Sequence, residues 1–370
     1  MKRQFPKAIA AGHICLDITP VFPEGRSAKL SEILRPGKLL EMKGCDIHTG
    51  GAVANTGLAM KILGVDVSLM GKIGDDEFGR IVLDALKKYN ADEGMIIAQG
   101  EQTSYSVVIA PPGVDRIFLH DPGTNNTFSA DDVNISAEQS ENTALFHFGY
   151  PPLMKKMYEN GGAELEKLFK KVKEMNMVTS LDMAAVDPGS EAGQVDWNAL
   201  LKRVLPYVDF FVPSVEELCY MLDKNRLCEW ENRTEGADLT SVIEPENDVR
   251  PLAEKCLEYG AKAVLVKCGA PGMYFMSSKA GEMSDICKIL NLNEEEWADI
   301  RRFKESMRVE KVVSATGAGD TSIAGFLTSL LMGMGPEMCL DAAAAAGARC
   351  VTTVDALSGL VPLKDMEELL

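Results

Sequence analysis

The sequence lacks the cysteine patterns that mark metal ribbons and disulfide scaffolds. Its nine cysteines are odd in number and scattered, with no C-x-x-C pair, which disfavours zinc ribbons, thioredoxin-type redox sites and disulfide frameworks. No stretch approaches the roughly 18 uninterrupted apolar residues of a membrane span, and the apolar run at 8–16 has no signal-peptide cleavage pattern after it. We therefore expect a cytoplasmic protein with reduced thiols.

Positive charge is also scarce. The chain has 38 Lys and Arg against 55 Asp and Glu, for a formal net charge of −17. A protein that binds nucleic acid or an anionic membrane diffusely should be basic, so we expect neither partner. The excess of acid does not exclude a phosphate ligand, because loop amides and a helix N-terminus can bind a polyphosphate locally.

What the sequence does contain is typical of a folded globular chain. Of its 370 residues 46% are hydrophobic and 25% charged, which argues against disorder. This length allows one large α/β domain with an excursion, or two domains. There is no internal repeat and no low-complexity tract.

Hydrophobic periodicity predicts strands that alternate with helices. Apolar spacing predicts helices over 53–63, which Gly64 would end, over 76–89 and over 251–259; strands are expected at 8–16, 65–69 and 263–267. Such alternation implies βαβ units and a mostly parallel sheet with helices on both faces.

Four regions break this rhythm. Residues 17–46 and 103–127 carry Pro, Gly and short alternating runs, and we expect them to form antiparallel strands set apart from the main sheet. Residues 223–248 and 284–309 are polar and charge-rich. We interpret these two as surface insertions rather than as separate domains.

The segment 312–327, VVSATGAGDTSIAGFL, is the most informative one. A β-branched pair, a glycine turn and an apolar helix follow one another, so we expect a strand, a turn and a helix N-terminus. Backbone N–H groups there would hold an anion, and Asp320 in the first helical turn could accept a proton from an attacking hydroxyl. In isolation the same string could equally be a turn capped by an acid.

Other glycine-loop families fit less well. No G-x-x-x-x-G-K-[ST] string exists, which excludes a Walker A loop, and no H-R-D loop of a protein kinase is present. The dinucleotide fingerprint G-x-G-x-x-G fails because residue 322 is Ser.

A second segment, 48–80, places Gly50-Gly51 before an expected helix and Asn55 one turn into it. Paired glycines let a ligand approach the backbone closely. Taken alone, these residues could also be turn glycines and an exposed amide.

Together, in this order and far apart in the chain, the two segments resemble the ribokinase-like (PfkB) carbohydrate kinases, over about residues 8–362. The resemblance implies one doubly wound α/β domain over 1–370, with a small β-sheet lid from about 17–50 and 103–127. It also implies transfer of the γ-phosphoryl group of ATP, with Mg²⁺, to a hydroxyl of a small carbohydrate. A monovalent cation and a homodimer paired through the lid are further features that it allows.

The resemblance also implies roles for individual residues. Asp320 matches the catalytic base, and Gly317, Ala318 and Gly319 match the anion hole. Glu217 matches the acid of an N-x-x-E motif that organises Mg²⁺ through water. The matching nucleotide-side residues are Lys267, Gly269, Gly272, Ala343 and Gly347, and the sugar-side residues are Asp17, Gly50, Gly51 and Asn55.

Three positions depart from the family pattern. Ser214 replaces the Asn of N-x-x-E, Ser314 replaces the Asp that opens D-x-x-G-A-G-D, and Ala52 stands where ribokinases proper often have Lys. These departures leave two alternatives open beside a kinase of fructose-like ketohexoses, 2-keto-3-deoxygluconate or ribose. One is a nucleoside kinase of the same family, and the other is a non-catalytic sugar or nucleotide sensor. A diverged dinucleotide oxidoreductase is a further alternative, which Ser322 disfavours.

The remaining polar residues have simpler interpretations. Asp182 ends an apolar strand, so it either points into the crevice at the carboxyl ends of the strands or caps a helix. The four histidines, His13, His48, His120 and His147, show no metal-binding spacing. We expect His120 to face solvent.

Overall fold

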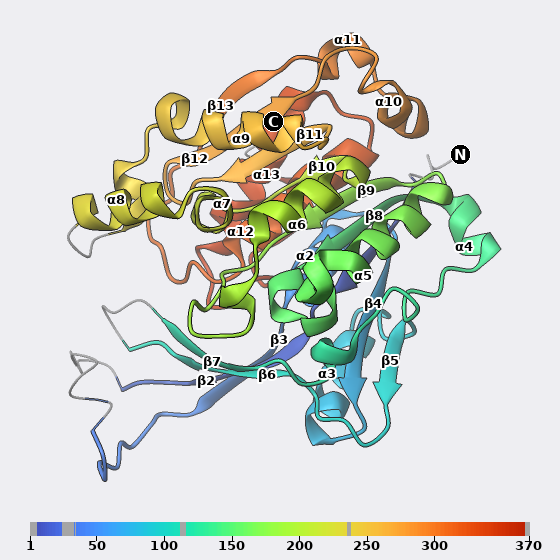
Figure 1. Cartoon of the computed structure of the whole chain (residues 1–370). Helices are drawn as coiled ribbons and strands as arrows, with labels where there is room; N and C mark the ends of the chain where they lie inside the picture. Colours follow the sequence, from blue (N-terminus) through green and yellow to red (C-terminus); the bar gives the residue numbers. More distant parts are fainter. Residues whose placement is uncertain (1–5, 24–32, 34, 112–115, 235–237, 367–370) are drawn as a thin grey trace.

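The structure, a computed structural model, describes residues 6–23, 33, 35–111, 116–234 and 238–366. It contains a nine-stranded main sheet and a four-stranded small sheet that extends away from it (Figure 1). In spatial order the main sheet comprises β13 (Arg301–Glu305), β12 (Gly272–Ser277), β11 (Ala263–Lys267), β10 (Phe210–Phe211), β9 (Val178–Asp182), β8 (Thr143–Gly149), β1 (Lys7–Gly12), β4 (Val67–Gly74) and β5 (Met95–Ala98). The small sheet comprises β3 (Cys45–Gly50), β2 (Cys15–Pro20), β6 (Tyr105–Ile109) and β7 (Ile117–Asp121).

The main sheet has the expected, mostly parallel arrangement. From β11 to β5 every neighbouring pair of strands is parallel. At one edge β12 pairs antiparallel with both β11 and β13, so β12 alone runs against the direction of the other strands of this sheet. Parallel strands need long crossover connections, and the helices supply them.

Helices cover both faces of this sheet, as expected (Figure 1). Along β1 the side chains alternate: Ala8 and Ala10 join one core with α2, α12 and α13, and Ile9 and Ala11 join the other with α5, α6, α7 and α9. The helices are α2 (Ala52–Leu63), α3 (Glu77–Lys87), α4 (Ala137–Asn142), α5 (Lys155–Glu174), α6 (Trp197–Val204), α7 (Val215–Leu222), α8 (Lys224–Thr234), α9 (Arg250–Glu258), α10 (Ser284–Leu290), α11 (Glu294–Trp297), α12 (Ala318–Leu331) and α13 (Pro336–Cys350).

The helices expected at 53–63, 76–89 and 251–259 are confirmed as α2, α3 and α9. Gly64 ends α2 in the left-handed region at φ 118°, where its N–H bonds to the last carbonyls. At the start of α3, the Asp76 carboxylate accepts a hydrogen bond from the Gly79 N–H.

The single strand expected at 8–16 is wrong. The chain forms β1 to Gly12, breaks at His13 and Ile14, and continues as β2 in the small sheet. The reason lies at Gly12, whose φ is 123° and whose missing Cβ would lie 2.4 Å from the Gly149 carbonyl oxygen. Apolar character continues through this break, so hydrophobicity alone could not reveal it.

The strand expected just before the glycine turn is also absent. Val312 and Val313 lie in irregular backbone and are 61% and 46% exposed. The Val313 N–H bonds to the Val351 carbonyl at 2.7 Å, outside any sheet. β-branched residues favour strands only where neighbours pack on them, and these two lack that packing.

The interpretation of 284–309 as a surface insertion is wrong for much of its length. This segment forms α10, α11 and the edge strand β13, and Trp297 is only 1% exposed between Phe210, Phe275 and Phe326. Residues 223–248 form α8 and two short helical turns, and Trp230 is 1% exposed there. Positions 235–237 of that segment lie outside the described residues.

The small sheet contains the strands expected within 17–46 and 103–127. β2–β3 and β6–β7 pair antiparallel, whereas β2 and β6 pair in parallel, which the sequence did not indicate. Positions 24–32, 34 and 112–115 of these regions lie outside the described residues. The chain leaves β3 directly into Gly51 and α2, so the small sheet is continuous with the main body at that point.

All nine cysteines are free, which agrees with the expected absence of a disulfide framework. Within the described part of the chain, no helix combines the length and the apolar character that crossing a membrane requires.

Candidate active site

Parallel strands β1, β8, β9 and β11 end at one edge of the main sheet, at Gly12, Gly149, Asp182 and Lys267. In doubly wound sheets ligands bind outside this carboxyl edge. Asp182 is the last residue of β9 and is the N-cap of none of the described helices whose caps are assigned. The structure therefore favours the interpretation that Asp182 faces the crevice over the interpretation that it caps a helix.

Asp320 lies in the first turn of α12, as expected, and is 4% exposed. Asn55 Nδ2 donates to its Oδ2 at 3.0 Å, and Thr56 Oγ1 donates to its Oδ1 at 3.3 Å. The Tyr150 hydroxyl donates to both oxygens, at 2.8 and 2.9 Å. The structure thus joins Asp320 to Asn55, a residue of the other motif 265 positions earlier.

The three anion-hole candidates, Gly317, Ala318 and Gly319, are half-buried at the start of α12. Gly317 takes φ 77° as the residue before the helix, a conformation that suits glycine. A Cβ on Gly319 would lie 3.7 Å from the Lys267 ammonium nitrogen. Lys267 therefore adds a formal positive charge beside the partial charge of the helix N-terminus.

Ser314 has a local role in this loop. Its hydroxyl oxygen accepts a hydrogen bond from the Thr316 N–H at 3.2 Å. A serine oxygen can thus take the turn-stabilising contact that an aspartate would make at this position.

Lys267 forms a buried ion pair with Asp182 at 2.7 Å. Asp182 is fully buried, and its second oxygen has no hydrogen-bond partner among the described residues. Burial raises the pKa of Asp182 to about 8, while the Lys267 charge opposes this rise. Burial acts to lower the pKa of Lys267. The negative charge of the facing Asp182 carboxylate raises it, and the net result is a raised pKa for this ammonium group.

Glu217 lies close to this pair, because Ser214, three residues before it, forms an isolated parallel bridge with Lys267. Ser214 and Glu217 form a reciprocal cap of α7: Ser214 N–H donates to Glu217 Oε2 at 2.7 Å, and Ser214 Oγ accepts from the Glu217 N–H. The replacement of Asn by Ser at 214 therefore leaves Glu217 fixed in place. The charge of Glu217 also acts on Asp182 and Lys267.

The other nucleotide-side candidates fall into two groups. Gly269 and Gly272 form the tight turn between β11 and β12, with φ of 64° and 136° and a Gly272 N–H to Gly269 carbonyl bond of 3.2 Å. Gly347 is half-buried on α13 against Ser322 of α12. Ala343 is 0% exposed in the core between α12 and α13, and its place beside a nucleotide stays a prediction.

The sugar-side candidates converge where β2, β3 and α2 meet. A Cβ on Gly50 would lie 2.3 Å from an Asp17 carboxylate oxygen, so only glycine leaves room for that side chain. Burial raises the pKa of Asp17, and the charge of Asp320 acts in the same direction. Gly51 has φ 86° and packs against the His13 carbonyl and ring. Ala52 is buried in α2.

Three site residues escaped sequence reasoning: His13, His120 and Tyr150. His13 and His120 bring their Nε2 atoms within 3.4 Å, and His120 Nδ1 lies 3.0 Å from Ser106 Oγ. The expectation that His120 faces solvent is therefore wrong, because β7 carries it inward against His13. The Tyr150 ring lies 5.9 Å from that of His13. Tyr150 could have been found from the sequence, because it comes directly after the apolar strand β8 and so lies at the carboxyl edge of the sheet.

His147, on β8, gives a prediction about pH. It is fully buried, and burial followed by the Lys267 charge lowers its pKa to about 3. A histidine in the unfolded chain has a pKa near 6.5. As the pH falls below that value, His147 takes up a proton in the unfolded chain but not in the folded protein, so the unfolded chain is favoured and stability is lost. We expect His147 to cost about 2 kcal/mol of unfolding free energy between pH 7 and pH 5.

Urea unfolding at both pH values checks this expectation. In His147→Gln the pH-dependent loss should shrink by that amount, whatever the variant's absolute stability. An unchanged pH dependence in the variant would contradict the role given to His147.

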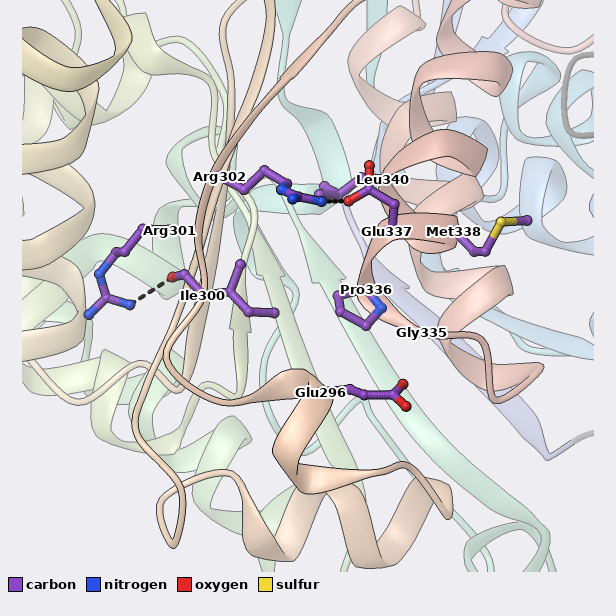
Figure 2. A pocket seen from close by; sticks show the side chains of 9 residues that line it. All are labelled: Glu296, Ile300, Arg301, Arg302, Gly335, Pro336, Glu337, Met338 and Leu340. Carbon is purple, nitrogen blue, oxygen red and sulfur yellow. Dashed lines mark hydrogen bonds and ion pairs between the residues drawn. The ribbon is translucent and has the colours of Figure 1, made fainter.

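A separate pocket of about 440 Å³ lies between β13 and the start of α13 (Figure 2). Arg302 is ion-paired with Glu337 there, and Arg301 lies 3.5 Å from Asp299. None of the candidate site residues lines it. Among the described residues, no cluster of three or more His, Cys, Asp and Glu side chains is arranged to bind a metal.

Comparison with known proteins agrees with this arrangement. Residues 13–362 match the family described as pfkB family carbohydrate kinase. An uncharacterized sugar kinase of Archaeoglobus fulgidus is 25% identical over 82% of this chain and 98% of its own length. A 2-dehydro-3-deoxygluconokinase of Thermoproteus tenax is 25% identical over 90% and 89%.

Solved structures show the same fold. The structure of Arabidopsis thaliana ribokinase complexed with ribose and ATP superposes with a TM-score of 0.69 at 20% identity, covering 99% of this chain and 98% of that one. Because the family match spans almost all of the sequence, the chain belongs to the pfkB family and is a carbohydrate kinase.

Proposed function

We propose that this kinase transfers the γ-phosphoryl group of ATP to a hydroxyl of a small sugar, with Asp320 as the general base. The observation that carries the proposal is the position of Asp320. It lies in the first turn of α12, beside Gly319 and the Lys267 ammonium. It accepts hydrogen bonds from the sugar-side residue Asn55 and from the neighbouring Thr56. A proton acceptor, a cation and backbone donors thus meet at one point.

Catalysis would rest on positioning and on electrostatic stabilisation. The transferring phosphoryl group would lie against the N–H groups of 317–319, where the helix N-terminus favours negative charge. Lys267 would neutralise phosphate oxygens from the β11 side. Asp320 would accept the proton of the acceptor hydroxyl as the oxygen attacks in line.

The residues present are compatible with Mg²⁺ held largely by water and phosphate. This ion keeps several waters and commonly takes one or two carboxylates together with substrate phosphates. Glu217, held by Ser214, would bind it through water. The Asp182 oxygen that has no hydrogen-bond partner among the described residues is a buried acceptor nearby. When bound, Mg²⁺ supplies charge neutralisation for the phosphates. A monovalent cation stays a prediction.

The acceptor would lie between Asp17, Gly51, Asn55 and Asp320. The sugar class is supported by the 2-dehydro-3-deoxygluconokinase relative and by the ribose complex of the ribokinase. We propose the ketohexose, 2-keto-3-deoxygluconate or ribose class.

The small sheet would act as a lid over this acceptor site. Two of the four connections between this sheet and the main body run through site residues, at His13 before β2 and at Gly51 after β3. Closing it would exclude water and so limit ATP hydrolysis. Its exposed apolar side chains Ile47, Phe118 and Leu119 would suit a homodimer paired through the lids.

ADP release from ATP and Mg²⁺ across a panel of acceptors tests the proposal. D-fructose, 2-keto-3-deoxygluconate, D-ribose and nucleosides should be included, and at least one sugar should give acceptor-dependent turnover. Tight binding of a sugar without any phosphoryl transfer would instead indicate a sensor. Turnover of nucleosides alone would overturn the sugar assignment.

A further inference from the structure

Tyr150 is held in a strained position at the carboxyl edge of the sheet. It follows β8 with φ 68° and ψ 42°, in the left-handed region. A non-glycine residue there costs roughly 1 kcal/mol and persists only where the surroundings fix it. Here its N–H bonds to the Asp182 carbonyl at 3.2 Å, its carbonyl accepts from the Leu153 N–H, and Pro151 follows.

This backbone directs the Tyr150 hydroxyl at the candidate base. It donates to both Asp320 oxygens, at 2.8 and 2.9 Å. Burial, reinforced by the charge of Asp320, raises the pKa of Tyr150 well above its usual 10, so the phenol stays protonated and remains a donor.

The contact occupies the position that an acceptor needs. A carboxylate offers about four lone-pair sites, and Asn55 and Thr56 already take one on each oxygen. A reacting hydroxyl must donate its proton to Asp320. Tyr150 presents the same chemical group, an O–H donor, to the lone pairs that remain on these two oxygens.

We propose that the Tyr150 hydroxyl takes the place of the acceptor hydroxyl at Asp320 and is displaced when a sugar binds. This inference rests on the proposed role of Asp320 as the base. Without sugar, Tyr150 keeps water from donating to Asp320, which lowers ATP hydrolysis. With sugar, the acceptor hydroxyl competes with Tyr150, so part of its binding energy is used to break the contact. Tyr150 is therefore a positioning residue that couples phosphoryl transfer to the presence of acceptor.

The test is Tyr150→Phe, which removes the hydroxyl and keeps the ring. ATP hydrolysis with Mg²⁺ and no acceptor should rise about three- to tenfold, since one hydrogen bond of ordinary strength is lost. For whichever of D-fructose, D-ribose and 2-keto-3-deoxygluconate is turned over, the KM of the sugar should fall by a similar factor. Its kcat should change by less than about threefold.

Tyr259→Phe is the matched control. It also removes a hydrogen-bonded phenol hydroxyl, the one that donates to Asn198 at 2.7 Å between α9 and α6. It should alter neither ATP hydrolysis nor the KM of the sugar. A role of Tyr150 in packing alone would make the two variants alike, and that result would overturn the inference.

Two further outcomes are decisive. A large fall of kcat in Tyr150→Phe, with KM and hydrolysis unchanged, would mean that Tyr150 stays on Asp320 throughout the reaction and is not displaced.

Asp320→Asn, assayed in parallel, separates the proposed role of Asp320 as the base from the proposed role of Tyr150. If that variant stays active the base assignment fails; if it is inactive and Tyr150→Phe behaves as wild type, only the role of Tyr150 fails.

Discussion

Asp320→Asn should lower kcat by about 10²- to 10⁴-fold, the usual contribution of a positioned general base. The amide keeps the size of the side chain but cannot accept the acceptor's proton. It also mismatches its partners, because Asn55, Thr56 and Tyr150 all donate to the carboxylate. ATP affinity should change little, since the backbone donors of 317–319 and Lys267 remain. Steady-state kinetics on an active sugar and calorimetric titration with ATP measure the two quantities.

Asp76→Asn is the control for this experiment. Asp76 is also an aspartate at the start of a helix, where it accepts from Gly79 N–H and Thr103 N–H, but it lies outside the site. Its substitution should leave kcat near that of the wild type. If Asp320→Asn kept more than about a tenth of the wild-type kcat, Asp320 would not be the base.

The features that sequence predicted well are the local ones. The helix at α2 and its end at Gly64 follow from side-chain spacing and one glycine. The start of α12 follows from the G-A-G-D string, because a left-handed turn and a first-turn acid are encoded within four residues. The proximity of Asn55 to Asp320 could not be predicted from local patterns. It was expected only because both segments resemble the same family.

The features that sequence missed depend on distant partners. The contact between Tyr150 and Asp320 spans 170 positions and leaves no periodic signal near either residue. His120 points inward only because β7 pairs beside β6 in a sheet whose order the sequence did not fix. Trp297 was hidden in a polar stretch, since four buried apolar residues (Ile286, Cys287, Leu290 and Trp297) leave the 26 residues of the range 284–309 polar and charge-rich on average.

Lys267→Met should lower the unfolding free energy by about 3–5 kcal/mol, because it leaves the buried carboxylate of Asp182 without its partner. The loss should grow above about pH 8. With Lys267 present the pKa of Asp182 is about 8, and removing the Lys267 charge raises that pKa further. Above pH 8 the folded variant therefore keeps a proton on Asp182 that the folded wild type and the unfolded chain have released, so the variant loses additional stability. Urea unfolding at about pH 7 and about pH 9.5 would measure both effects, with the larger loss at the higher pH.

The same variant should also bind ATP weakly, and a double variant separates the two consequences. Asp182→Asn added to Lys267→Met removes the uncompensated charge, so it should recover most of the stability but none of the ATP affinity. Lys173→Met is the matched control, because Lys173 pairs with the buried Asp209 at 2.8 Å, away from the site. It should destabilise the fold and leave ATP affinity unchanged. If the double variant regained ATP binding along with stability, Lys267 would serve the fold through Asp182 and not the nucleotide.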